Sequence, residues 1–78
     1  MEDLFLVKDL YVAGYFYANG LRFKGVRRDG PICWFEFDDK KRCAKLQQDY
    51  FAGVGNANAK SYADALKTLK GVIFDFTS

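Results

Sequence analysis

Residues 21–37 read LRFKGVRRDGPICWFEF, and this stretch decides the fold. Apolar and cationic residues alternate over residues 21–28, the period-two pattern of a half-buried strand. The DGP triplet at 29–31 combines an acid, a residue free to adopt positive φ and a ring that cannot donate a hydrogen bond to a neighbouring strand, which is typical of a turn. Residues 32–37 are rich in aromatic and β-branched residues, which favour a second strand. The stretch therefore predicts an antiparallel β-hairpin.

The two faces of this hairpin differ in polarity. We expect the core face of the second strand to carry Cys33, Phe35 and Phe37, and the other face to carry Ile32, Trp34 and Glu36. In the first strand, Leu21 and Phe23 are in phase with the core. Val26 falls out of that phase unless the strand carries a bulge at Gly25. We predict the bulge; the alternative is an exposed Val26.

Three helices are predicted around the hairpin, because a two-stranded ribbon is marginal in water and needs a cover on its apolar face. The first spans residues 10–18, with Asp9 as N-cap and Gly20 after its end. The second begins at Asp38-Asp39 and ends before a loop at 53–57. The third runs from 59 to about 70, with Asn58 as cap and Gly71 as its end. The predicted apolar stripe of the second helix is Cys43, Leu46 and Tyr50, with Ala44 and Phe51 beside it. The stripe of the third helix is Tyr62, Ala65, Leu66 and Leu69.

The two terminal segments leave alternatives open. Residues 2–7 are either a short strand that joins the hairpin or an arm that packs on it, and residues 72–76 are either a final strand or an apolar tail. The predicted fold is a single α+β domain over residues 1–78. Its centre is the antiparallel hairpin, which terminal strands can extend, packed against three helices.

The first helix is apolar nearly all round, and a helix without a polar face is normally buried. Gly14 in its middle costs about 1 kcal/mol relative to alanine, which indicates a neighbouring backbone or ring packed closely at that point. Half of the 78 residues are hydrophobic, more than a small core encloses. We therefore predict a homodimer with Tyr11 and Tyr15 in its interface. The alternative is that this helix is the central core element of a monomer.

The order of these elements resembles a known family. The motifs are Asp9-Leu10 before an apolar helix, the 35–38 run FEFD before an acid-capped helix, YFAG at 50–53, and an Asn58-led helix with Ala65-Leu66 and Leu69-Lys70. Together they resemble a family of very small bacterial and phage proteins catalogued as a domain of unknown function. The resemblance implies the α+β order and a bacterial or phage origin, and it transfers no catalytic or binding residue.

Basic residues concentrate in the middle of the chain. Residues 21–45 contain eight cations and four acids, whereas residues 1–20 have a net charge of −2. Cations interleaved with an aromatic side chain suit single-stranded nucleic acid, which binds through phosphate contacts and base stacking. The candidate residues for this function are Arg22, Lys24 and Arg28, which we expect on one face of the hairpin, together with Trp34, Lys40 and Arg42. The alternative is that these strand cations solvate a sheet edge and deter aggregation.

Catalytic and metal chemistry find little support in the sequence. There is no histidine, and Cys33 and Cys43 match no metal-ligand spacing. The acids Glu36, Asp38 and Asp39 could hold Mg²⁺, but helix capping accounts for them without chemistry. We expect no catalytic residue, no cofactor and no metal.

Location and function are predicted as follows. The acidic N-terminal residues do not form the positive region of a signal peptide, and the apolar runs are too short for a membrane span, so we expect a cytoplasmic protein. The sequence predicts a non-enzymatic binding protein that acts on a partner protein, with nucleic-acid binding as the alternative.

Overall fold

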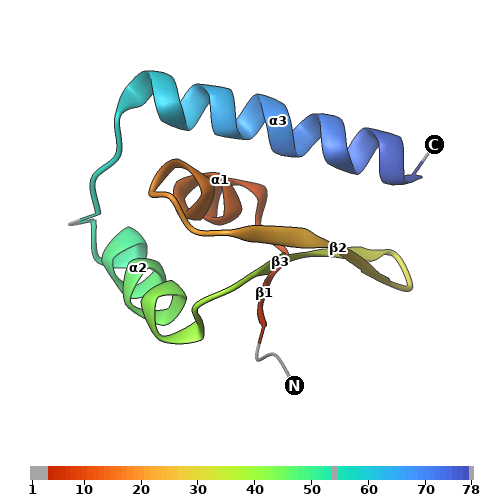
Figure 1. The fold of residues 1–78 in the computed structure, drawn as a ribbon, viewed down its shortest axis with the longest axis horizontal. Helices are drawn as coiled ribbons and strands as arrows, with labels where there is room; N and C mark the ends of the chain where they lie inside the picture. The colour runs from red at the N-terminus through yellow and green to blue at the C-terminus, as the bar shows by residue number, and fades with distance from the viewer. Residues whose placement is uncertain (1–3, 54, 78) are drawn as a thin grey trace.

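The three strands of the chain form one antiparallel sheet in the order β1-β3-β2, with helices α1, α2 and α3 around it (Figure 1). A computed structural model describes residues 4–53 and 55–77. The elements are β1 (Phe5–Val7), α1 (Leu10–Ala18), β2 (Phe23–Asp29), β3 (Ile32–Phe37), α2 (Lys40–Ala52) and α3 (Ala59–Thr77). The α+β prediction is confirmed. Of the two alternatives for the first segment, the strand is correct from Phe5; residues 2 and 3, and residue 54 of the predicted loop, lie outside the described residues.

The predicted bulge at Gly25 is present. Phe23 pairs with Phe37 and Gly25 pairs with Glu36, so the register shifts by one residue between these two pairs. After the bulge Val26 pairs with Phe35 and packs against the core. The same shift corrects the prediction that Arg28 shares a face with Lys24. Arg28 pairs with Cys33, so it lies on the core side of the sheet near the turn.

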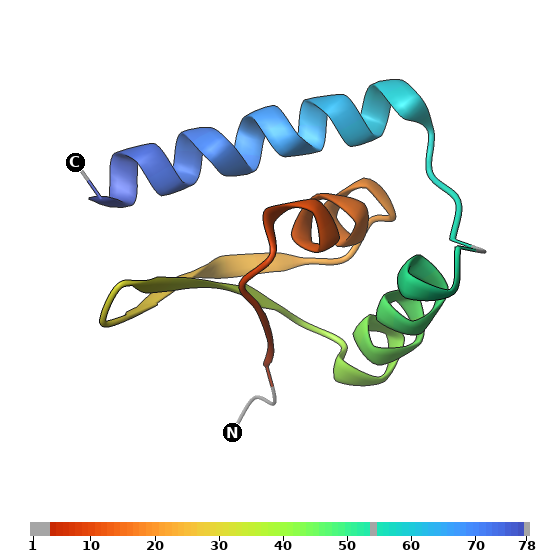
Figure 2. The same cartoon turned by 180° about the vertical axis from the view of Figure 1, so that it is seen from behind.

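Helix α1 occupies the centre of the molecule, between the sheet, α2 and α3 (Figures 1 and 2). Asp9 caps it, because its Oδ1 accepts hydrogen bonds from the Tyr11 and Val12 amides. The fully buried Phe16 ring contacts the Phe5 and Phe37 rings at centroid distances of 5.8 and 5.4 Å. Neighbours within one chain therefore cover most of this apolar helix, which accounts for its composition without a second subunit.

Gly14 explains how closely α1 and α3 approach each other. A Cβ added there would lie 2.6 Å from Leu66 Cδ2 and 3.4 Å from Tyr62 Cε1. Any larger side chain would push these two side chains of α3 away. The close neighbour predicted from the mid-helix glycine is therefore confirmed.

Helix α2 closes the other side of the core. Asp39 adopts φ 64° and caps the helix through the Arg42 amide. Cys43 is fully buried and Leu46 and Tyr50 are half-buried, as the predicted stripe requires. The two residues placed beside this stripe are instead exposed: Ala44 and Phe51.

Helix α3 is longer than the sequence predicts. Asn58 caps it as expected, since its Oδ1 accepts from the Lys60 and Ser61 amides. Gly71 does not end the helix, which continues to Thr77, so residues 72–76 are neither a strand nor a tail. Val72 and Ile73 are half-buried in the extra turns, and their burial offsets the cost of about 1 kcal/mol for a helical glycine.

Replacing Gly71 by alanine tests this continuation. Apart from the adjoining residues and backbone of the same helix, no atom of the described residues lies within 4 Å of the position of the new Cβ, so the substitution should stabilise the fold by about 0.5–1 kcal/mol. Urea unfolding followed by circular dichroism measures the change. Gly14→Ala is the matched control, because its Cβ meets Leu66, and it should stabilise less or destabilise. A Gly71→Ala protein less stable than the parent would contradict a helix through this position.

Candidate functional site

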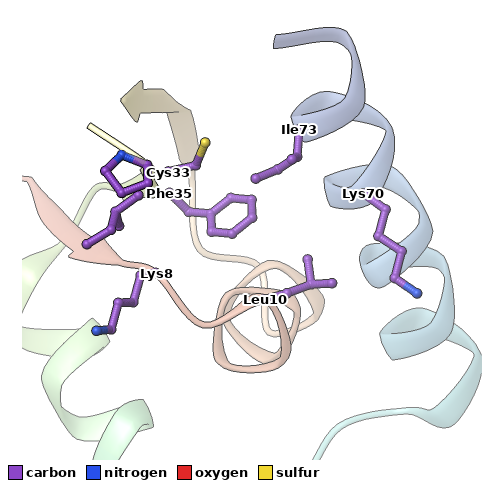
Figure 3. Close-up of a pocket in the computed structure, with 8 residues that line it drawn as sticks. Lys8, Leu10, Cys33, Phe35, Lys70 and Ile73 are labelled. Carbon is purple, nitrogen blue, oxygen red and sulfur yellow. The ribbon is translucent and has the colours of Figure 1, made fainter. Parts of the chain in front are cut away.

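A groove of about 450 Å³ lies between the hairpin and the C-terminal half of α3 (Figure 3). We call it the hairpin–α3 groove. Leu10, Phe35 and Ile73 form its apolar walls, and they come from α1, β3 and α3. The full lining is Lys8, Leu10, Pro31, Ile32, Cys33, Phe35, Lys70 and Ile73. Its size falls within the range of pockets that bind ligands.

Among the described residues, the charged ones that line the hairpin–α3 groove are two lysines. Figure 3 shows Lys8 and Lys70 on opposite sides, with their ammonium groups directed away from the centre of the groove. Their hydrocarbon stems add apolar wall while the charges stay in solvent. The groove therefore has an apolar interior with a positive charge at each side.

Exposed apolar side chains lie around the same end of the molecule. Phe74 is 71% exposed and Ile32 is 37% exposed. Phe74 follows Lys70 by one helical turn, so the two share a side of α3. Phe76, two residues after Phe74, is 44% exposed on a different side of the helix. An apolar groove with exposed apolar side chains such as Phe74 and Ile32 beside it is typical of a surface that binds another molecule.

The basic residues predicted for nucleic-acid binding do not form one surface. Lys24 and Trp34 belong to the sheet face that points away from the core. Arg22 is exposed and lies immediately before the first residue of β2. Arg28 lies on the core side, where its Nε donates to the Gly30 carbonyl at 3.1 Å.

The remaining two predicted residues, Lys40 and Arg42, are in the first turn of α2. The Arg42 guanidinium donates to the Asn19 carbonyl at 2.9 Å, so it joins α2 to the end of α1. Arg27 is not among the six candidates, although it lies near the turn of the same hairpin; it pairs with Trp34 across the hairpin and lies 3.1 Å from Glu36 Oε2 in an ion pair.

The two tyrosines predicted for a dimer interface have different surroundings. Tyr11 is 54% exposed and can contact another molecule. Tyr15 is a core residue: its ring packs on Tyr50, and its hydroxyl accepts a hydrogen bond from the Asn56 amide at 3.0 Å. Of these two tyrosines, only Tyr11 is exposed enough to contact a partner directly.

The two cysteines are free thiols in different surroundings. Cys33 is half-buried and lines the hairpin–α3 groove. Cys43 is fully buried and its Sγ donates to the Asp38 carbonyl. Burial, together with the negative charges of Asp39 and Asp38, raises the pKa of the Cys43 thiol to about 11.

Alkylation should therefore separate the two thiols. Because the thiolate is the reactive form, N-ethylmaleimide at neutral pH should modify Cys33 in the native protein and leave Cys43 intact. Peptide mass spectrometry counts and locates the adducts. In urea both thiols should react. Modification of Cys43 under native conditions would show that the core opens more readily than this packing implies.

Stability should fall at alkaline pH. The pKa of Tyr62 is raised from 10.0 to about 12, mainly by burial and to a smaller extent by a hydrogen bond with the Tyr50 side chain. The pKa of Cys43 is raised from 9.0 to about 11. A raised pKa favours the protonated form in the folded state, so this stabilisation is complete below pH 9 and lost as pH rises to 12. Urea unfolding across this range measures it, and Tyr62→Phe should lessen the decline above pH 10.

The acids considered for Mg²⁺ have structural partners. Glu36 pairs with Arg27, and Asp39 caps α2. In the parts of the chain that the structure describes, no three metal-ligating side chains come together. Among the helices built from these residues, none is long and apolar enough to cross a bilayer.

Comparison with known proteins identifies the family of this chain. A family model described as "Domain of unknown function (DUF5659)" matches residues 2–75, almost the whole chain. No curated protein and no solved structure matches the chain significantly.

Proposed function

This chain belongs to the DUF5659 family, as the resemblance of its motifs predicted, and we propose that it is a small non-enzymatic binding protein that acts on a partner protein. The observation that carries the proposal is the hairpin–α3 groove, an open apolar hollow beside the exposed Phe74 and Ile32. Interface energy concentrates where side chains of one protein fill pockets of the other. A groove of about 450 Å³ accommodates a few such side chains.

The chemistry around the groove also favours binding over catalysis. The titratable side chains that line it are two lysines and the Cys33 thiol, so the lining holds no carboxylate or imidazole that could serve as a general base. We propose that binding takes place in the cytoplasm of a bacterial or phage-infected cell. Two free thiols suit a reducing compartment, and the origin is the one that the family resemblance implies.

Selection of a displayed random-peptide library on the folded chain tests the groove. The affinity of peptides that bind in the groove should fall at least about tenfold after Ile32→Gln, because this substitution removes an apolar side chain from its lining. Phe51→Gln is the matched control, since Phe51 is 69% exposed and does not line the groove.

Chemical blocking gives an independent measurement. An N-ethylmaleimide adduct on Cys33 should occupy the groove and prevent binding, whereas Cys33→Ser protein treated in the same way should still bind. The proposal is wrong if selection enriches no peptide. It is also wrong if the enriched peptides are indifferent both to Ile32→Gln and to the adduct.

Nucleic-acid binding is the second candidate, and one observation favours it. The outer face of the sheet carries Trp34 beside Arg27, with Lys24 on the same side, and no described helix packs on that face. The Arg27–Glu36 ion pair reduces the positive charge available there, so we rank this function second. It predicts affinity for single-stranded DNA that falls steeply with salt and is weakened by charge reversal at Arg22 and Lys24.

Self-association remains a proposal, and the exposed Tyr11 side chain is the interface residue that we propose for it. Light scattering coupled to size-exclusion chromatography measures the mass against 8.9 kDa for one chain, and the ratio of absorbance at about 260 to 280 nm detects bound nucleic acid. A dimer that Tyr11→Glu converts to monomer supports self-association. A parent protein that is monomeric at low salt and carries absorbance at about 260 nm supports the second candidate.

A further inference from the structure

We propose that the hairpin–α3 groove binds a segment of a partner protein in which a few apolar side chains are flanked on both sides by aspartate or glutamate. This inference rests on the proposed function and specifies the chemistry of the partner. The walls of the groove are apolar, and the charged groups that line it are cationic: Lys8 on one side and Lys70 on the other. The apolar side chains would fill the interior and the acids would lie at its two sides.

The positions of the lysines carry the argument. Their ammonium groups point outward from opposite sides of the groove, so neither charge is buried by an apolar occupant (Figure 3). A carboxylate next to each end of the apolar segment would then meet a partly exposed cation at the rim. Charges placed in this way contribute mainly to specificity and to the rate of association, while the apolar contacts supply affinity.

In the part of the chain that the structure describes, no acid is paired with these lysines. Asp9 follows Lys8 in the chain, but its carboxylate accepts hydrogen bonds from the amides of Tyr11 and Val12, at the positive end of α1. Among the described residues, neither Lys8 nor Lys70 forms an ion pair. The positive charge on both sides of the groove is therefore available to an incoming acidic segment.

The shape of the groove favours a protein segment over a small acidic molecule. The hollow is open, and the apolar surface continues beyond it over Phe74. Because Lys8 and Lys70 lie on opposite sides of the groove, a chain that crosses it can place one acid beside each of them (Figure 3).

The peptide selection described above tests this inference through the composition of the enriched peptides. We expect apolar residues with acids before and after them, and replacement of those acids by Asn and Gln should weaken binding at least about tenfold at low salt. The double variant Lys8→Glu/Lys70→Glu should lose the same factor or more. The matched control Lys41→Glu/Lys60→Glu makes an equal change in net charge at exposed positions outside the groove, and it should change affinity at most about twofold.

The possible outcomes separate this inference from the proposed function. Two results would overturn the inference and leave the groove as a docking site. In the first, the enriched peptides depend on Ile32 but show no excess of acids. In the second, they bind the Lys8→Glu/Lys70→Glu protein as well as the parent. Failure to enrich any peptide would overturn both. Circular dichroism and the thermal midpoint confirm that each variant is folded, and equal loss in both double variants would also count against the inference.

Discussion

Replacing Phe16 by alanine is expected to lower the free energy of unfolding by about 3–5 kcal/mol. Phe16 is fully buried, and its ring touches Phe5 on β1 and Phe37 on β3. A domain of 78 residues has a total stability of about 4–12 kcal/mol, so this one cavity should remove a large part of it. Urea unfolding, or a thermal midpoint lowered by about 4–8 °C for each kcal/mol lost, measures the effect.

The matched control for this prediction is Phe74→Ala. It removes the same atoms from a side chain that is 71% exposed, and it should change stability by less than about 0.5 kcal/mol. A Phe16→Ala protein with nearly the stability of the parent would show that α1 is not the centre of the core.

Replacing Leu69 by alanine should cost about 2–5 kcal/mol. Leu69 is fully buried and belongs to the central cluster, where it anchors α3. Because α3 packs mainly on α1, the cavity would weaken the contact that holds this helix in place. Loss of helical signal and increased proteolysis within α3 should accompany the lower stability.

Thr68→Ala is the control for Leu69→Ala, since it changes the neighbouring exposed position of the same helix and should be close to neutral. If both variants were equally stable, the packing of α3 described above would be wrong. Leu69→Ala should also weaken peptide binding, because Lys70 and Ile73 of the groove would lose their fixed positions.

Local signals in the sequence were enough to locate most elements. Asp9 and Asn58 cap their helices as their side-chain chemistry predicts, and Gly20 adopts φ 84° after the end of α1. Each of these features depends on a few neighbouring residues. The bulge at Gly25 was also predictable, because Val26 would otherwise have lost its place on the core face.

Features that depend on distant contacts were not predictable in the same way. The bulge moves Arg28 to the core side of the sheet, because the register beyond Gly25 is set by the pairing of β2 with β3. Gly71 reads as a helix end, but the burial of Val72 and Ile73 outweighs its cost. The all-round apolar character of α1 left two interpretations open, a subunit interface and a central core element, and its coverage by the sheet, α2 and α3 depends on contacts between segments far apart in the chain.

The hairpin–α3 groove is another feature that local sequence signals do not reveal. Its residues come from the start of α1, the hairpin and the end of α3, which are far apart in the chain. No short motif connects Lys8 with Lys70, and Ile73 is part of the α3 wall of the groove only because this helix continues past Gly71. The signal that could have indicated it is the continued helical spacing of Leu66, Leu69 and Ile73.

The packing of α3 on α1 also bears on the order of events in refolding. The whole hairpin and α2 lie between these two helices in the chain, so their association must close a long loop, whereas β2 and β3 meet across a tight turn. Such local pairings form quickly, and distant ones set the rate. We therefore expect the hairpin to form early and α3 to dock late, which makes the groove among the last features to be completed.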